Sequence, residues 1–422
     1  MINFILSVLT LAMTLNVSAQ SVYGQSNDLM SAKPEGLSKY DLQQAPHNRW
    51  TLSNIDQIFP NVKIQNDPSN IRALDGNPVH PENVSFTFNG AETNLDAFLK
   101  TQYADGIIVL KDGKVLVEGY YGALNEDKPH LMMSMTKSIA GVLAGIFVEK
   151  GMLDLSKTTE YYLPEMKNSG WANDTVRALL DMKDSSAYVE EFLDQSINGW
   201  EHMCASDWYD GDDCNADMAK NNYEFLPSVE LNPENTGKFI YKSATTDVVG
   251  WILERLSGKS QADLIEEYIW KPMGAEHQAY ITVDSAGFAM AGGGMNASLR
   301  DMARFGQMIL NNGKVGNKQL VPEAFIHDAM NQPKEPTWAS EEGWYGDDPY
   351  YRSFFWGVGD GENTIDMLGV NGQVVRIAPK SNMVIAIFSS WPEMDVTDKD
   401  GYGWGWNDAL LNALIAKYRD TD

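Results

Sequence analysis

Ser134 and Lys137 are the residues whose types and spacing most directly suggest covalent chemistry. They bound a Ser-Met-Thr-Lys segment, and no other serine of the 422-residue chain has a lysine three positions later. Residues i and i+3 share one face of a helix, so the lysine amine would lie beside the serine hydroxyl. A desolvated lysine can remove the proton that makes a serine a weak nucleophile. The spacing predicts a lysine-activated serine, although a helix cap beside a solvated lysine would share it.

The segment after this pair predicts the environment of the lysine. Residues 138–148 are apolar on nearly every face of a helix, which is typical of a buried helix. Burial disfavours the charged form of a lysine, and the positive end of a helix acts in the same direction. We therefore expect Lys137 to be a usable base.

Two further segments carry candidate site residues. Tyr241 and Ser243 follow a strand-like run at 238–240 and precede an apolar helical run at 248–253. Two residues apart on an extended segment, they would point to the same side, where Tyr241 could exchange a proton with Ser134 and Ser243 could donate a hydrogen bond. A tyrosine packed at the end of a strand is the simpler interpretation.

The third segment is Leu-Gly-Val-Asn-Gly-Gln at 368–373, ahead of a strand at 374–378. Its glycines, which include Gly372, would let backbone approach a ligand closely. The backbone amides of Gln373 and Ser134 could then form a two-donor oxyanion hole. A glycine-rich strand entry or bulge is the alternative.

Together these segments resemble the serine β-lactamase and penicillin-binding-protein superfamily, most closely its class C-like esterases and 6-aminohexanoate-dimer hydrolases. The resemblance extends in order from about residue 46 to residue 418. The other segments that carry it are 46–50, 58–60, 132–138, 179–182, 205–208, 292–295 and 355–357.

The resemblance implies a fold and a set of roles. The fold is α/β (α+β), an antiparallel sheet flanked by helices with an inserted, mostly helical domain, over residues 46–420. Ser134 would be the acylated nucleophile, Lys137 its base and Tyr241 the proton-transfer partner, with Gln373 in the oxyanion hole. Many relatives carry a cation in the third segment, where this chain has none. That departure disfavours β-lactams, which present a carboxylate there; Arg376 could substitute, or could face away and pair with an acid.

Local patterns support such a sheet. Residues 107–110 and 115–118 flank an Asp-Gly pair, which predicts a hairpin, and 374–378 and 383–388 predict a second one. Residues 409–418 predict a terminal amphipathic helix. Hairpins near both ends, around a helical middle, indicate one sheet assembled from distant segments.

The first 45 residues are expected to lie outside the catalytic fold. An apolar run at 4–15 is too short to span a membrane, and small residues at 17 and 19 suit cleavage, so residues 1–19 predict a signal peptide and an exported protein. Residues 1–3 lack the positive charge that usually precedes the apolar run of a signal peptide. An N-terminal helix packed on the folded domain is the alternative. Residues 20–45 are expected to be a mobile lead-in.

The two cysteines, Cys204 and Cys214, suit an exported protein and could close a disulfide, with two free thiols as the alternative in a reducing compartment. We expect no cofactor and no metal. His202 lacks further spaced ligands. A group of acids at 207–213 resembles a calcium-binding loop only loosely, and a solvated acidic loop is the simpler interpretation. The acids are Asp207, Asp210, Asp212 and Asp213.

A net charge of −26 disfavours nucleic acid and anionic membranes as partners. Acids around 181–213 could attract a cationic amine substrate, although plain solubility explains them too. An aromatic tract at 338–356 is expected to line the cleft or the core. We therefore expect a small amide or ester substrate, and the oligomeric state stays open.

The expected activity is hydrolysis of a linear amide or ester through an acyl-enzyme. A carboxylesterase, a D-amino-acid peptidase and a β-lactamase are the alternatives of the same mechanism. The chain has no His-Glu-x-x-His and no Gly-x-Ser-x-Gly, which disfavours a metallohydrolase and an α/β-hydrolase. A non-catalytic binding protein is the alternative of another class.

Overall fold

The computed structural model describes residues 33–209, 214–333, 345–346, 348–399 and 401–420, and its largest element is an eight-stranded sheet. All neighbours in this sheet are antiparallel except β2 and β6, which are parallel. Its strands are, in spatial order, β12 (Tyr350–Arg352), β13 (Phe355–Gly357), β14 (Ile365–Gly369), β15 (Gln373–Ala378), β16 (Met383–Ser389), β5 (Ala104–Lys111), β6 (Lys114–Tyr120) and β2 (Asp75–Val79).

The sheet joins distant parts of the chain, as predicted. β16 pairs with β5 from Met383–Lys111 to Ser389–Ala104, so strands from the two ends of the domain meet at the centre of the sheet. Both predicted hairpins are present. The turn between β5 and β6 places Asp112 and Gly113 at positive φ, as a two-residue hairpin turn requires.

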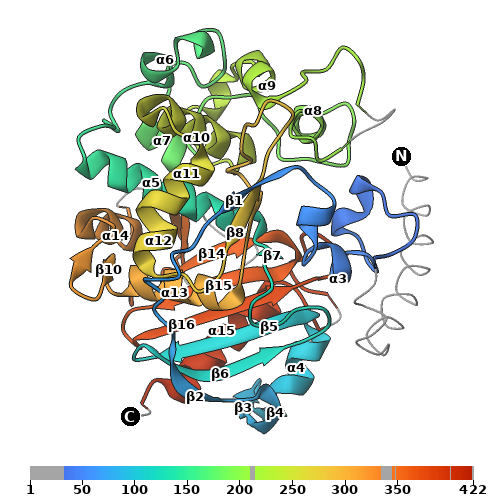
Figure 1. Cartoon of the computed structure of the whole chain (residues 1–422), viewed down its shortest axis with the longest axis vertical. Helices are drawn as coiled ribbons and strands as arrows, with labels where there is room; N and C mark the ends of the chain where they lie inside the picture. Colours follow the sequence, from blue (N-terminus) through green and yellow to red (C-terminus); the bar gives the residue numbers. More distant parts are fainter. Residues whose placement is uncertain (1–32, 210–213, 334–344, 347, 400, 421–422) are drawn as a thin grey trace.

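Helices cover both faces of the sheet (Figure 1). One face contributes to a core shared with α5, α10 and α13, and the other packs against α4 and α15. The helices are α3 (Asn48–Thr51), α4 (Leu95–Thr101), α5 (Thr136–Glu149), α6 (Thr159–Tyr162), α7 (Val176–Leu180), α8 (Asn198–Ala205), α9 (Asn222–Ser228), α10 (Ser243–Ser257), α11 (Gln261–Ile265), α12 (Lys271–Met273), α13 (Leu299–Leu310), α14 (Glu323–Met330) and α15 (Trp404–Tyr418).

The chain from α5 to α11 forms the helical part expected for the middle of the chain, and it is drawn in green and yellow above the large sheet in Figure 1. Its central helix, α5, is buried from residue 136 to residue 147, because apolar or small residues occupy every face. This confirms the predicted buried helix after Ser134.

A second sheet, which sequence patterns did not reveal, supports the start of α5. Its strands are β1 (Asn61–Ile64), β8 (Ala279–Thr282), β9 (Met295–Ala297) and β7 (His130–Leu131), in that order. Two small hairpins complete the strands: β3 (Ser85–Phe88) with β4 (Ala91–Asn94), and β10 (Lys314–Val315) with β11 (Lys318–Gln319). Because β7 ends three residues before Ser134, this sheet fixes the approach to the nucleophile.

Three local predictions differ from the structure. Residues 238–240 form no strand, since Ser243 already begins α10 and the preceding segment is irregular. The terminal helix starts at Trp404 rather than at residue 409. Part of the expected lead-in packs on the domain: residues 39–43 form a 3-10 turn, and Leu42 is buried.

The predicted signal peptide at 1–19 lies outside the described residues. In the part of the chain that the structure covers, no helix is both long enough and apolar enough to cross a membrane.

Candidate active site

Ser134 lies in a one-turn 3-10 segment, η4 (Met133–Met135), directly before α5. Met133 has a φ of 49°, a left-handed conformation that is strained for a non-glycine residue. The backbone around it is held on both sides, since Met132 N donates to Met295 O at 2.9 Å and Thr136 Oγ1 donates to Met133 O at 2.7 Å. The chain thus presents Ser134 at the helix start.

Lys137 extends from the first turn of α5 toward Ser134. Its Nζ lies 2.8 Å from Ser134 Oγ, 2.8 Å from Ser243 Oγ and 2.5 Å from Gly292 O. The side chain is buried, and no ion pair among the described residues includes it. Burial lowers the pKa of Lys137 to about 8, although the charges of Glu190 and Asp247 oppose this shift.

Tyr241 lies over the same amine from the segment that leads into α10. Lys137 Nζ is 4.8 Å from the centre of the Tyr241 ring, and the Tyr241 hydroxyl is hydrogen-bonded to Ser134. Burial, first, and then the charge of Glu190 raise the pKa of Tyr241 above its ordinary value. A neutral tyrosine therefore contacts both Ser134 and Lys137, so these three predicted residues lie together.

Ser243 completes the contacts of Lys137, and it reveals a residue that the sequence analysis missed. Ser243 N donates to Glu190 Oε2 at 2.6 Å, and Ser243 Oγ donates to the other oxygen of the same carboxylate. Ser243 is the first residue of α10, so Glu190 caps the positive end of that helix. One acid among 58 Asp and Glu residues, in an irregular segment, gave no signal in the sequence.

The third predicted segment contributes other residues than expected. Gly372 and Gln373 do not line the cleft: Gly372 packs on Trp391, and the Gln373 side chain donates to Ser389 O at 2.6 Å. The part that lines the cleft is residues 368–370. A Cβ on Gly369 would lie 2.5 Å from Met132 O and 3.1 Å from Ser134 N, so glycine is required where β14 ends against the nucleophile segment.

The site opens into a cleft of about 910 Å³. Most of its lining is apolar, and it carries four carboxylates and one ammonium group. Apolar lining residues include Leu42, Met133, Phe192, Leu193, Met203, Trp208, Met290, Trp356, Leu368, Val370 and Trp404; the charged ones are Glu190, Glu191, Glu393, Asp395 and Lys39.

The acids of the cleft differ in part from those predicted. Glu190 and Glu191 fall in the predicted 181–213 region, and Asp207 is not among the lining residues. Of the aromatic tract, Trp356 lines the cleft, whereas the other described members are core residues. Trp338, Trp344, Asp210, Asp212 and Asp213 lie outside the described residues.

Arg376 does not replace the missing cation. It is buried and pairs with Asp366 and Asp408, each through Nη2, at 2.7 and 2.6 Å. This confirms the predicted alternative that it pairs with acids, because a buried guanidinium needs counter-charges.

The two cysteines form the disulfide that the sequence allowed, Cys204–Cys214, with a Cα–Cα distance of 5.6 Å. His202 is fully buried and hydrogen-bonded to Tyr188 and Asp247. Within the described residues, no group of three or more His, Cys, Asp or Glu side chains could hold a metal ion.

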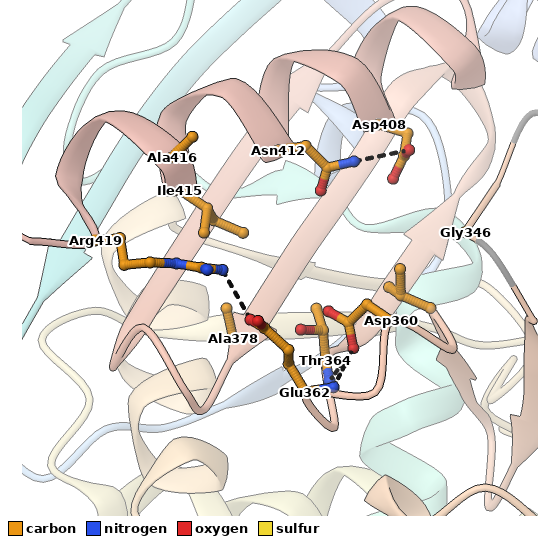
Figure 2. A pocket seen from close by; sticks show the side chains of 11 residues that line it. Gly346, Asp360, Glu362, Thr364, Ala378, Asp408, Asn412, Ile415, Ala416 and Arg419 are labelled. Atoms are coloured by element: carbon orange, nitrogen blue, oxygen red, sulfur yellow. Dashed lines mark hydrogen bonds and ion pairs between the residues drawn. The ribbon is translucent and has the colours of Figure 1, made fainter.

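A second cavity, of about 590 Å³, lies between α15 and the strands that follow residue 345 (Figure 2). It is acidic, but its acids are already engaged. Glu362 pairs with Arg419 at 2.8 Å, Asp408 pairs with Arg376, and Asp360 accepts the backbone N–H of Glu362 at 2.8 Å. Its described lining residues include no serine, cysteine or lysine, so this cavity is not the candidate catalytic centre.

A sheet of this topology, with a serine, a buried lysine and a tyrosine brought together at the edge of a helical part, is the arrangement expected of a serine hydrolase. Comparison with known proteins agrees: a family profile described as Beta-lactamase matches residues 94–405. The chain belongs to this serine β-lactamase family and is a hydrolase of it.

Among individual relatives, the 6-aminohexanoate-dimer hydrolase of Paenarthrobacter ureafaciens is 30% identical over 359 residues, which are 84% of this chain and 88% of that protein. A Bacillus anthracis structure, provisionally named a 6-aminohexanoate-dimer hydrolase, superimposes with a TM-score of 0.81 at 26% identity, over 92% of this chain and 98% of that one. A Bacteroides dorei DSM 17855 structure, provisionally named a β-lactamase, has a TM-score of 0.61 at 20% identity over 77% and 97% of the two chains, and shows the fold alone.

Proposed function

We propose that this protein cleaves a linear amide or ester bond through an acyl-enzyme on Ser134. The observation that carries the proposal is the contact of 2.8 Å between Ser134 Oγ and the Nζ of Lys137, a buried lysine with no carboxylate in contact. Such an amine gives up its proton at moderate pH and can then take the proton of the serine.

The first half of the reaction forms the acyl-enzyme. Neutral Lys137 accepts the Ser134 proton while Oγ bonds to the substrate carbonyl carbon. The negative oxygen that develops binds the backbone amides of Ser134 and Val370, which we propose in place of Gln373 because Val370 lines the cleft beside Gly369. Tyr241 donates its proton to the leaving nitrogen or oxygen, the bond from carbon to that atom breaks, and Lys137 passes the serine proton on to Tyr241, so that both groups are neutral again.

The second half releases the acid. Water attacks the ester on Ser134 and gives a proton to the Lys137–Tyr241 pair. The tetrahedral intermediate then collapses, and Ser134 Oγ leaves with the returned proton. Both halves use the same groups, so no additional base is required.

The proposed substrate is a linear amide of an amino acid with a long apolar chain, such as 6-aminohexanoate dimer. Its methylenes suit the apolar lining, and its ammonium group suits the carboxylates of the cleft, of which Glu190 also accepts from Ser243 and Glu393 also pairs with Lys399. The relative from Paenarthrobacter ureafaciens carries that name, which supports the same class. A β-lactam fits less well, because the third segment offers its carboxylate no cation.

A carboxylesterase of neutral substrates is the second candidate, favoured by the same apolar lining. The deciding experiment compares 6-aminohexanoate dimer, its N-acetyl derivative and p-nitrophenyl butyrate with wild type and Ser134→Ala. We expect turnover of the dimer that Ser134→Ala abolishes and a higher KM for the uncharged N-acetyl derivative. Serine-dependent cleavage of the ester alone would instead assign an esterase, and activity surviving in Ser134→Ala would refute the acyl-enzyme.

We propose that the protein is exported, on the apolar run at 4–15 and the small residues at 17 and 19. Sequencing the N-terminus of the protein secreted by a bacterial host tests this. A start at residue 20 is expected, and an intact residue 1 would contradict it.

A further inference from the structure

A line of buried groups lies behind Lys137, on the side away from the cleft. Lys137 Nζ donates to Gly292 O, and Gly292 N donates to Asp247 Oδ1 at 2.8 Å. Asp247 Oδ2 lies 2.9 Å from His202 Nε2. Asp247 and His202 have no solvent-exposed surface, so their polar atoms depend on these partners.

The line continues until it returns to the site. His202 Nδ1 lies 3.0 Å from the Tyr188 hydroxyl, and that hydroxyl is also hydrogen-bonded to Glu190. Glu190 holds Ser243, whose Oγ contacts Lys137. The groups therefore form a closed ring, which links the two carboxylates that act on the catalytic amine.

The Gly292 carbonyl has a specific effect in this ring. A neutral lysine amine has two N–H groups and one lone pair. When Gly292 O and Ser243 Oγ receive the two N–H groups, the lone pair is left for the Ser134 hydroxyl. Position 292 has no room for a side chain, since a Cβ on Gly292 would lie 2.9 Å from Ser243 O.

We propose that Asp247 is a positioning residue for Lys137, on which it acts through the Gly292 peptide and through its own negative charge. This inference rests on the proposed function, in which Lys137 is the base. Asp247 does not touch the cleft, and none of its contacts is explained by substrate binding.

The charges that face Lys137 come from two elements. Glu190 lies in the segment before α8 and Asp247 lies on α10, and both raise the pKa of Lys137 against the effect of burial. Tyr241 is the other titratable group in contact, and burial keeps it neutral. Removing the charge of Asp247 leaves burial less opposed, so the pKa of Lys137 should fall below about 8.

Asp247→Asn tests this with little change of shape. The asparagine oxygen can accept the Gly292 N–H, and its NH2 can donate to His202 Nε2 if the other imidazole nitrogen carries the proton and donates to Tyr188. Every hydrogen bond is kept and one charge is removed. The readout is the rate at which a fluorophosphonate probe labels Ser134 at each pH, which needs no knowledge of the substrate.

We expect the midpoint of the labelling profile to move to lower pH by about half a unit or more, equivalent to about threefold on its acid limb. The matched control is Asp184→Asn, another buried aspartate, which binds Lys242 instead and should leave the midpoint in place. If Asp247→Asn does not accumulate as folded protein, Asp247→Ser replaces it, since its cavity admits water to both partners.

An unmoved midpoint in a folded Asp247 variant, or an equal shift in Asp184→Asn, would overturn this inference while the proposed function stands. Wild-type protein that is not labelled at Ser134 would instead overturn the proposed function, together with the role assigned here to Asp247.

Discussion

Two lysines of this protein, Lys137 and Lys242, are fully buried, and both lie close to Ser243: Lys137 contacts its hydroxyl, and Lys242 precedes it in the sequence. Their polar partners nevertheless differ. Lys242 pairs with Asp184 at 2.9 Å and also donates to Ser186 O at 2.8 Å. Lys137 has three neutral oxygens around it and no carboxylate in contact. Lys242 immediately precedes Ser243, so the backbone alternation that directs Tyr241 and Ser243 to one side directs Lys242 to the other.

The difference shows how a buried lysine can serve either the stability of the fold or acid–base chemistry, depending on whether a carboxylate contacts it. A buried ammonium group is costly unless an opposite charge compensates it, and Asp184 compensates Lys242. Burial lowers the pKa of Lys137 to about 8, because Glu190 and Asp247 oppose this shift only through space and not by direct contact. The lysine proposed as the base is therefore the buried one without a salt bridge.

Replacing the base should have the largest effect. Lys137→Arg keeps a positive charge at every accessible pH and cannot accept a proton. We expect kcat to fall about a thousandfold or more on amide and ester substrates alike. Stopped assays with p-nitrophenyl butyrate measure the loss, and circular dichroism confirms that the variant is folded. A folded variant with a near-normal rate would refute the role of Lys137.

Replacing the other lysine should affect stability instead. Lys242→Met leaves Asp184 buried without its partner, which costs about 3–5 kcal/mol in the free energy of unfolding. Urea unfolding measures this cost. The double variant Lys242→Met/Asp184→Leu should recover part of it, because no charge is then left unpaired. If Lys242→Met lost activity but kept its free energy of unfolding, Lys242 would have a role in the chemistry and not in the stability of the fold.

Tyr241 lies against Lys137 and immediately precedes Lys242 in the sequence. Its replacement therefore tests whether it takes part in the chemistry of Lys137 or only in the packing around Lys242. Tyr241→Phe removes the hydroxyl bonded to Ser134 and keeps the ring over Lys137. We expect amide turnover to fall about tenfold more than turnover of p-nitrophenyl butyrate, whose leaving group needs no proton. Equal losses on both substrates would contradict proton delivery by Tyr241.

The pH profile gives the most direct test, and it needs no variant. Because Lys137 acts in its neutral form, kcat/KM should rise with pH up to about 8 and level off above it. Below that value the rate should fall about tenfold per pH unit, as one proton is bound. Initial rates between pH 5.5 and 9.5 check this, and a rate independent of pH below 7 would show that Lys137 is already neutral there.

The sequence predicted those parts of the site that local geometry determines. Ser134 and Lys137 are three residues apart at a helix start, and a buried helix was evident from the apolar residues after them. Tyr241 and Ser243 reach the same amine even though the expected strand at 238–240 is absent, because the extended backbone of Lys242 alone provides the alternation.

The remaining parts depend on tertiary placement. Gly292 acts through its carbonyl, which no side-chain pattern reveals, and Glu190 is defined by a contact 53 positions away along the chain. Gln373 was predicted for the oxyanion hole, but a 3-10 turn at 370–372 moves it past the cleft into the core. The four-stranded sheet was missed because its strands are two to four residues long.

The pairing of β16 with β5 has a consequence for biosynthesis. A ribosome makes Ser134 and its helix long before residue 383, yet the sheet that supports them is completed only when β16 pairs with β5. Contacts so distant in sequence form slowly, since a long loop must close first. A nascent chain that carries the serine and the lysine is therefore expected to stay without hydrolase activity until the last strands leave the exit tunnel, so that the site forms only once the chain is nearly finished.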